Sequence, residues 1–333
     1  MKTRIFVLAT GGTIASELTP SGLAPALTPE DLVSYLPEIS EYVEITTESL
    51  YSIDSTNMTP EHWMGICKRI EANYDAYDGF VIAHGTDTMA YTAAALSYMI
   101  QNSPKPIVLT GAQKPIGMEI TDAKANLRDS IIYAADSKSR GVQVVFDGKV
   151  IAGTRAKKIR TTSFAAFDSI NFPFLASIYD GKIIRYTEMQ HDGDEVSFNY
   201  DLKSKVFLMK VVPGVTPELL PVIFMIYDGI IIESFGAGGI PESIEKQLFD
   251  EMKKYDPLKK VVVMQTQVSF EGSNINVYEV GKKLSSNFDV LEAKDMTTEA
   301  VYTKLMWVLS QNNESWEELR DRFYKPIGCD MLF

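Results

Sequence analysis

Two short segments of this chain place hydroxyl groups where they could act on a carbonyl. Thr13 follows the glycine pair Gly11-Gly12, and Thr86 with Asp87 follows His84-Gly85. Glycines permit tight turns and let the backbone approach a ligand closely. A threonine hydroxyl is a weak nucleophile at neutral pH, so this chemistry needs a base or a strongly polarising neighbour. From one such turn alone, an ordinary strand-to-helix turn with a threonine cap would be the better interpretation.

Histidine and lysine are the residues that could serve as that base. The chain has three histidines, namely His62 in a helical pattern, His84 in the second turn and His191 in a polar stretch. They give little support to a Ser-His-Asp triad, and a histidine such as His84 more often has a structural role. Lysine is the alternative, as in Ser-Lys catalytic pairs. Lys157 and Lys158 are both candidates, although such a basic run is usually a solvated face.

The segments before these turns predict the elements that position them. Ile5–Ala9, Gly79–Ala83 and 106–111 are continuous apolar runs, which are typical of strands buried on both faces of a parallel sheet. Helical patterns follow at Met89–Ile100 and 122–135. The alternation predicts an α/β fold in which both threonines lie at the carboxyl ends of strands, where open α/β sheets bind ligands.

The domain organisation is predicted from length and from a polar interruption. A chain of 333 residues usually exceeds one compact core, and residues 189–205 are polar and aperiodic. We expect a larger N-terminal domain, 1–188, with a mostly parallel sheet and flanking helices. Asp147-Gly148 between apolar runs predicts a hairpin that adds an antiparallel part. After a linker over 189–205, residues 206–333 predict a smaller, parallel-sheet (Rossmann-like) α/β domain.

Composition narrows the classes of partner and the compartment. The net charge of −12 disfavours nucleic acid and anionic membranes, which both attract clustered lysine and arginine. Cys67 and Cys329 lie far apart without a C-x-x-C motif, so neither a disulfide framework nor a zinc site is expected. Met1 leads directly into a strand, and no apolar run has the length of a membrane span. These features predict a cytoplasmic protein.

Several motifs together resemble those of one enzyme family, the L-asparaginases. Ala9–Ala15 (ATGGTIA) resembles the first signature of that family, and His84–Met89 (HGTDTM) resembles the second. Asp54–Met58 looks like the loop that holds the substrate carboxylate, and 153–158 is similar to the segment with the catalytic lysine, which selects Lys158 over Lys157. Residues 295–307 resemble the C-terminal segment of the cytoplasmic, type I bacterial branch. The resemblance covers nearly the whole chain.

The resemblance implies hydrolysis of L-asparagine to L-aspartate and ammonia, without metal or organic cofactor. It implies that Thr13 attacks the side-chain amide to form an acyl-enzyme, and that Thr86, Asp87 and Lys158 form a hydrogen-bonded proton relay. Backbone N–H groups of the Thr86 turn would stabilise the oxyanion. The implied substrate contacts are the α-carboxylate with Ser55 and Thr56 or Asp54, the α-ammonium with Asp87, and the leaving amide nitrogen with the carbonyl of Ala112.

The chain also departs from the family pattern. Residues 17–27 are expected to form a surface loop over Thr13, and Leu23 stands where the family usually supplies a tyrosine. Leu23 can exclude water but cannot orient Thr13 by a hydrogen bond, so Leu23→Tyr should change activity. The stretch Thr266–Ser269 lacks the cysteine of the activating site of some type I enzymes, which disfavours allosteric activation.

Three further expectations concern assembly and alternatives. The family assembles homodimers that often pair into homotetramers. Glutamine is only one methylene longer than asparagine, a difference worth about 1–3 kcal/mol in a pocket, so a related amidohydrolase with notable L-glutaminase activity is an alternative. The alternatives are a non-catalytic amino-acid sensor and the related subunit of the tRNA-dependent amidotransferase. That subunit carries an additional N-terminal domain, whereas here the first signature begins within ten residues of Met1.

Overall fold

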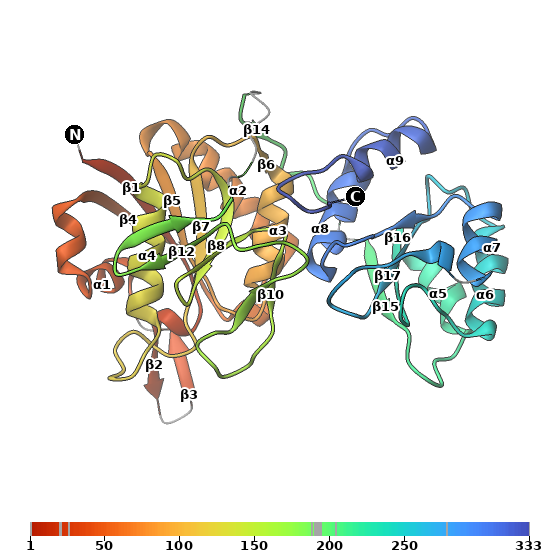
Figure 1. Cartoon of the computed structure of the whole chain (residues 1–333), viewed down its shortest axis with the longest axis horizontal. Helices are drawn as coiled ribbons and strands as arrows, with labels where there is room; N and C mark the ends of the chain where they lie inside the picture. Colours follow the sequence, from red (N-terminus) through yellow and green to blue (C-terminus); the bar gives the residue numbers. More distant parts are fainter. Residues whose placement is uncertain are drawn as a thin grey trace. The chain divides into compact units, whose positions relative to one another are not determined.

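The computed structural model divides into two compact units, Met1–Tyr200 and Asp201–Phe333. Figure 1 shows the first in red to green and the second in teal to blue. The division falls inside the segment 189–205. The structure describes residues 2–19, 22–25, 27–187, 189, 195–203, 205–277 and 279–332.

An eight-stranded sheet forms the centre of the N-terminal unit. Five parallel neighbours lie in the order β8-β7-β5-β1-β4, namely β8 (Gly141–Phe146), β7 (Pro106–Thr110), β5 (Gly79–Ala83), β1 (Thr3–Gly11) and β4 (Val43–Ile53). The antiparallel strands β9 (Lys149–Ala152), β12 (Ala176–Tyr179) and β13 (Lys182–Arg185) extend the sheet beyond β8. The predicted hairpin is confirmed, because Asp147 and Gly148 join β8 to β9 with positive φ.

The apolar runs of the sequence become the core of this sheet. All five residues of β5 are buried, as is the run Ile5–Gly11 of β1. The described helices of this unit are α1 (Pro29–Ser34), α2 (Pro60–Asn73), α3 (Met89–Met99) and α4 (Ala123–Ala135). Helix α4 packs against the sheet (Figure 1), where its neighbours include β5 and β7. Thr28 and Thr59 each form a capping box before a proline, which favours the start of a helix at both positions.

Two segments differ from the sequence expectation. The composition of 17–27 predicts an aperiodic loop, but β2 (Ser16–Thr19) and β3 (Gly22–Pro25) form an antiparallel pair. Two short strands that lie next to each other in the sequence can pair without a long alternating hydrophobic pattern, so the sequence did not reveal them. The segment 189–205 includes β14 (Ser197–Phe198), which pairs with β6 (Ile100–Gln101). There Phe198 provides the apolar contact, with its ring centroid 5.3 Å from that of Tyr74.

Short elements connect the main ones in this unit. They are the 3-10 helices η1 (Thr13–Ala15), η2 (Pro37–Glu41), η3 (Ser55–Asn57) and η4 (Tyr74–Ala76) and the paired strands β10 (Ala156–Lys158) and β11 (Phe167–Ser169).

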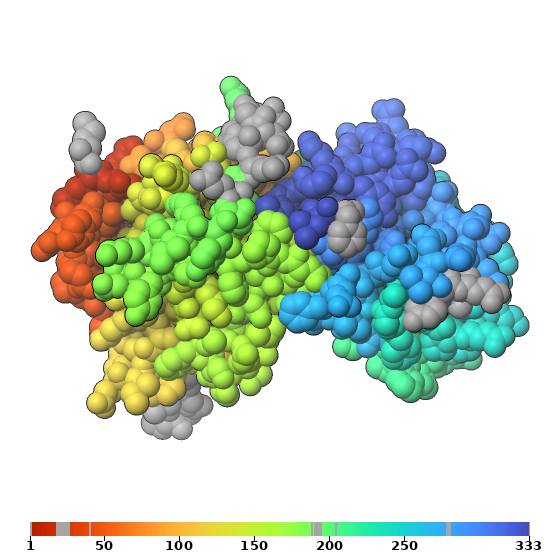
Figure 2. Space-filling model, in the orientation of Figure 1, coloured from red at the N-terminus to blue at the C-terminus, as the bar shows by residue number. Residues whose placement is uncertain are grey.

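Figure 2 shows the green surface that includes β12 and β13. Strand β13 is an edge strand whose ends carry Lys182 and Arg185, and charges of this kind disfavour pairing with other chains.

The C-terminal unit has a four-stranded sheet in which every neighbouring pair is parallel. Its strands, in sequence and spatial order, are β15 (Val206–Lys210), β16 (Gly229–Ser234), β17 (Val261–Thr266) and β18 (Leu291–Glu292). Its other elements are α5 (Leu219–Ile226), α6 (Glu242–Met252), η5 (Ile275–Val277), α7 (Glu279–Asn287), α8 (Thr298–Ser310) and α9 (Trp316–Tyr324). The predicted two-domain α/β fold class is confirmed. Of the helices that the structure describes, none combines the length and the apolar character needed to cross a membrane.

Candidate active site

Four neighbouring parallel strands end at one edge of the large sheet, and each is followed by a residue that the sequence singled out. Asp54 follows β4 and Thr86 lies beyond β5. Thr13 and Ala112 lie just beyond β1 and β7. Because parallel strands point the same way, these four turns share the carboxyl edge of the sheet. The structure therefore gathers segments that lie far apart in the sequence.

Glycines let these turns pack backbone against backbone. Gly12 has φ of +82°, and a Cβ built on it would lie 2.4 Å from the Cα of Gly85. A Cβ on Gly85 would in turn lie 2.5 Å from Oγ of Ser55. A Cβ on Gly111 would lie 2.3 Å from the carbonyl oxygen of His84. No side chain fits at these three contacts. Glycine is therefore required at these positions because the turns approach one another so closely.

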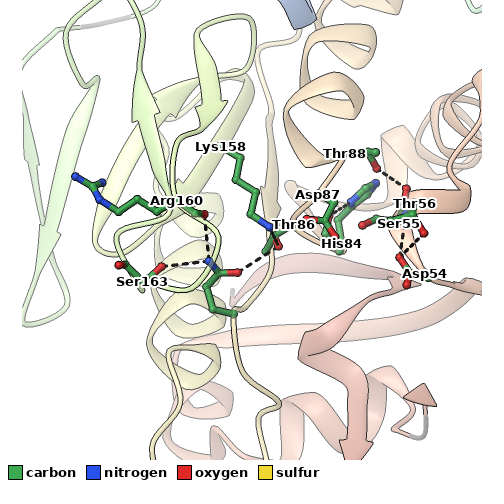
Figure 3. A network of polar contacts seen from close by, with 12 residues as sticks. Asp54, Ser55, Thr56, His84, Thr86, Asp87, Thr88, Lys158, Arg160 and Ser163 are labelled. Carbon is green, nitrogen blue, oxygen red and sulfur yellow. Dashed lines mark hydrogen bonds and ion pairs between the residues drawn. The ribbon is translucent and has the colours of Figure 1, made fainter. Parts of the chain in front are cut away.

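Lys158 joins the second turn from the β10–β11 hairpin. Its Nζ donates to Oγ1 of Thr86 and to Oδ1 of Asp87, both at 2.7 Å (Figure 3). The Lys158 side chain is 17% exposed whereas that of Asp87 is 57% exposed, so this ion pair opens to solvent at the carboxylate. Thr86 is buried. Hydrogen bonds from a charged donor are about twice as strong as neutral ones, and this one holds the Thr86 hydroxyl in a fixed position.

The strand geometry separates the two candidate lysines. Lys157 and Lys158 are successive residues of β10, where they lie opposite Asp168 and Phe167 of β11. Successive side chains of a strand point to opposite faces. The face that carries Lys158 reaches Thr86, so Lys157 is directed away from it.

Thr13 begins η1, one residue after the glycine that contacts the second turn. Its side chain is half-buried and has no hydrogen-bond partner among the residues described. The turn itself is braced, because Oγ of Ser16 donates to the carbonyl of Gly12 at 2.9 Å. Leu23 lies in β3, where it pairs with Leu18.

The remaining predicted substrate contacts differ in burial and in the hydrogen bonds that they already make within the protein. Oδ1 of Asp54 accepts hydrogen bonds from the backbone N–H and the hydroxyl of Thr56, both at 2.9 Å (Figure 3). Asp54 and Thr56 are thus engaged with each other. Ser55 is buried, and its carbonyl accepts from the hydroxyl of Thr88 at 2.8 Å. Ala112 is also buried.

His84 has the structural role that its position suggested. Its Nδ1 lies 2.7 Å from the carbonyl oxygen of Gly85, and its Nε2 lies 2.9 Å from the hydroxyl of Thr92. Burial lowers the pKa of His84 to about 4, so its imidazole is neutral at pH 7. His62 forms part of the capping box at the start of α2, and His191 lies outside the described residues.

One residue at the site was not singled out from the sequence. Oε1 of Gln113 lies 3.4 Å from Oγ1 of Thr86, and Gln113 directly follows Ala112 in the turn after β7. Its position next to a predicted contact and its amide side chain were the signals that could have indicated it. In the described part of the chain, no three His, Cys, Asp or Glu side chains gather as the ligands of a metal ion would.

Family models match both units of the chain. Residues 4–191 match the model described as "Asparaginase, N-terminal", and residues 205–323 match the "Glutaminase/Asparaginase C-terminal domain". An L-asparaginase from Thermococcus kodakarensis is 38% identical, over 98% of this chain and 99% of the relative. A solved structure of the thermostable L-asparaginase from that organism superposes with a TM-score of 0.92 at 36% identity, covering 99% of this chain and 100% of the other.

Two further similar proteins are an amidotransferase subunit and a second L-asparaginase. A glutamyl-tRNA(Gln) amidotransferase subunit from Methanosphaera stadtmanae is 38% identical, over 94% of this chain and 73% of its own length. The crystal structure of L-asparaginase I from Vibrio cholerae has a TM-score of 0.88 at 30% identity, and each chain is covered completely.

Proposed function

The chain belongs to the asparaginase family of amidohydrolases, and from this premise we propose that it hydrolyses L-asparagine to L-aspartate and ammonia. One observation carries the proposal. Nζ of Lys158 lies 2.7 Å from both the hydroxyl of Thr86 and the carboxylate of Asp87, in the turn that packs against the Thr13 turn.

Thr13 is the proposed nucleophile. Its hydroxyl attacks the side-chain amide carbon of asparagine, the C–N bond breaks, and ammonia leaves as Thr13 becomes acylated. Backbone N–H groups of the turn before α3 would stabilise the tetrahedral oxyanion, because the N-terminus of a helix favours negative charge. The half-buried position of Thr13, and its lack of a hydrogen-bond partner among the described residues, support this role.

Thr86, Lys158 and Asp87 are the proposed relay. As the Thr86 oxygen takes the proton from the attacking hydroxyl, Thr86 passes its own proton to Nζ of Lys158 in its neutral amine form, and the relay returns a proton to the leaving nitrogen. The same relay takes a proton from the hydrolytic water and returns one to Thr13 as the acyl-enzyme is cleaved. Asp87 keeps the Lys158 side chain in place. The contacts of Nζ with both residues support this division of roles.

The substrate would be oriented by groups from three turns. Ser55, with Thr56 or Asp54, would bind the α-carboxylate, and the exposed carboxylate of Asp87 would bind the α-ammonium. The Ala112 carbonyl would accept from the leaving amide. Because the N–H and the hydroxyl of Thr56 both donate to Asp54, Ser55 is favoured as the donor to the substrate.

Ammonia release from L-asparagine tests the proposal. Thr13→Ala and Thr86→Ala should each lower kcat at least about 100-fold, while Thr216→Ala, an exposed threonine of the C-terminal unit, should leave it unchanged. Equal release by the wild type and both site variants would eliminate the enzymatic function and favour an amino-acid sensor.

A second candidate function is that of a tRNA-dependent amidotransferase subunit, which the relative from Methanosphaera stadtmanae favours. A protein with that role would depend on a partner protein and tRNA. Rapid turnover of free asparagine by the purified chain alone therefore favours the first function. The ratio of the kcat/KM values for asparagine and glutamine would measure which of the two substrates the enzyme prefers.

We further propose a cytoplasmic homodimer or homotetramer with domains 1–188 and 206–333 joined by 189–205. Cys67 and Cys329 are not joined in a disulfide, which is consistent with a reducing compartment. Light scattering of the purified protein measures the assembly.

A further inference from the structure

Thr88 occupies the N-cap position of α3, but its hydroxyl does not cap that helix. A capping threonine usually has an extended backbone and accepts a hydrogen bond from an N–H of the first helical turn. The Thr88 side chain makes no such bond, and its φ of −118° and ψ of 10° are not extended. Its hydroxyl instead donates to the carbonyl oxygen of Ser55 at 2.8 Å (Figure 3). The Thr88 hydroxyl therefore serves a tertiary contact rather than its own helix.

The carbonyl that accepts this hydrogen bond belongs to the turn after β4. It also accepts from the N–H of Met58 at 3.0 Å, next to η3. A carbonyl oxygen has two lone pairs, so the two donors together satisfy it. The bond from Met58 is local to the turn, whereas the bond from Thr88 joins residues that are 33 positions apart. Thr88 therefore ties the turn of Ser55 to the turn of Thr86.

The side chain of Ser55 lies against the same turn and has a free hydroxyl. A Cβ added to Gly85 would lie 2.5 Å from Oγ and 2.7 Å from Cβ of Ser55, so the serine side chain rests on the Gly85 backbone. Ser55 is 3% exposed, and its Oγ has no hydrogen-bond partner in the described part of the chain. An unpaired hydroxyl on a buried residue calls for a partner, and in the proposed function this partner is the substrate α-carboxylate.

Asp87, the proposed partner of the substrate α-ammonium, directly precedes Thr88 in the chain. The α-carboxylate and the α-ammonium of an amino acid are attached to one carbon atom, so the two protein groups that bind them must keep a fixed separation. One of these groups is on Ser55 and the other is on Asp87. The hydrogen bond from Thr88 to Ser55 is a direct link between their two turns.

The geometry points to Thr88 as a positioning residue that holds Ser55 at the separation from Asp87 that an α-amino acid requires. This inference rests on the proposed function, in which these two residues bind the substrate α-carboxylate and α-ammonium. Thr88 acts through Ser55 and takes no part in the proton relay. Its loss should therefore weaken binding of the substrate and leave the chemical step unchanged.

Two substitutions separate the hydrogen bond from the space that the side chain fills. Thr88→Val keeps the shape of the side chain but leaves the Ser55 carbonyl with the Met58 N–H alone. Thr88→Ser keeps the hydroxyl and removes a methyl group. Thr303→Val in α8 of the C-terminal unit is the matched control, because the Thr303 hydroxyl also donates to a backbone carbonyl at 2.8 Å, that of Glu299.

Steady-state ammonia release from L-asparagine gives kcat and KM for each variant. Thr88→Val should raise KM about fivefold, the scale of one lost hydrogen bond, with kcat within about twofold of the wild type. Thr88→Ser should restore KM to within about twofold, and Thr303→Val should match the wild type in both constants. A role of Thr88 in the fold alone would lower the fraction of active protein, and so kcat, without raising KM.

Binding of L-aspartate makes the same comparison without turnover. This molecule keeps the α-carboxylate and the α-ammonium, so its Kd, measured by isothermal titration calorimetry, reports on the same two contacts. The Kd should rise about fivefold in Thr88→Val and stay within about twofold of the wild type in Thr88→Ser and Thr303→Val.

Three results would overturn the inference. They are a wild-type Kd for L-aspartate in Thr88→Val, a loss in Thr88→Ser as large as in Thr88→Val, and a loss in Thr88→Val that appears in kcat but not in KM. Failure of the proposed function looks different. A wild-type chain that binds L-aspartate but releases no ammonia from L-asparagine lacks the enzymatic function, whereas the calorimetric comparison still decides the role of Thr88.

Discussion

Gly12 and Gly85 lie so close that a methyl group on Gly12 would stand 2.4 Å from the Cα of Gly85. This contact joins the turn of Thr13 to the turn of Thr86, although the two come from different strands. The two hydroxyls that the proposed mechanism uses are therefore placed by a contact in which neither of them takes part.

Gly12→Ala should separate the two turns. Its methyl group would clash with the backbone of Gly85, and the backbone conformation of Gly12, with φ of +82° and ψ of 178°, adds strain of about 1–3 kcal/mol for a non-glycine residue. Gly214→Ala is the matched control, because Gly214 has φ of +87° and a Cβ added to it would meet no atom within 4 Å. We expect backbone strain in both variants, because both positions have positive φ, but a loss of kcat/KM of at least about 100-fold only for Gly12→Ala. Equal activity of the two variants would contradict the role of this contact.

Lys158→Met should remove the proton relay while keeping most of the volume of the side chain. It loses the donors to Thr86 and Asp87, and kcat should fall by about 100-fold or more. Lys157→Met, on the opposite face of the same strand, should stay within about twofold in kcat. Steady-state ammonia release measures both, and similar losses in the two variants would argue against the assignment of Lys158.

His84 should make the stability depend on pH below neutrality. Burial lowers its pKa in the folded state from 6.5 to about 4, so between these values the unfolded chain binds the extra proton. The stabilisation is fully present above pH 6.5 and is lost as the pH falls toward 4. Relative to His84→Gln, the wild type should lose about 2 kcal/mol of unfolding free energy between pH 7 and pH 5. Urea unfolding measures this difference, and parallel pH profiles would refute the prediction.

The buried pair of Lys304 and Asp330 should be sensitive to the loss of one partner. Nζ and Oδ2 lie 2.6 Å apart, both side chains are fully buried, and burial lowers the pKa of Lys304. Lys304→Met leaves Asp330 as a buried carboxylate without this cation and should cost about 3–5 kcal/mol of unfolding free energy. The double variant Lys304→Met/Asp330→Leu should recover part of that loss.

An exposed ion pair of the same unit provides the control. Lys253→Met, which breaks the exposed contact with Asp250, should change the unfolding free energy by less than about 1 kcal/mol. If Lys304→Met costs no more than Lys253→Met, the buried pair does not stabilise the C-terminal unit.

Much of the fold follows from local patterns in the sequence. The continuous apolar runs at β1, β5 and β7 predict buried parallel strands, because a strand covered on both faces has no polar side to expose. Capping signals at Thr28 and Thr59 mark two helix starts. The β2–β3 pair could not be predicted in this way, since two strands of four residues each are too short to show such a pattern.

The sequence by itself determined that Thr13 and Thr86 each follow a strand and that lysine is a possible base, and the motifs favoured Lys158. Spacing along the chain says nothing of which turns meet. Only the tertiary structure decided that Lys158, 72 positions from Thr86, reaches its hydroxyl, and that Gln113 reaches it from another turn. The physical reason is that strand order and glycine contacts, which join distant segments, are set by packing of the whole sheet.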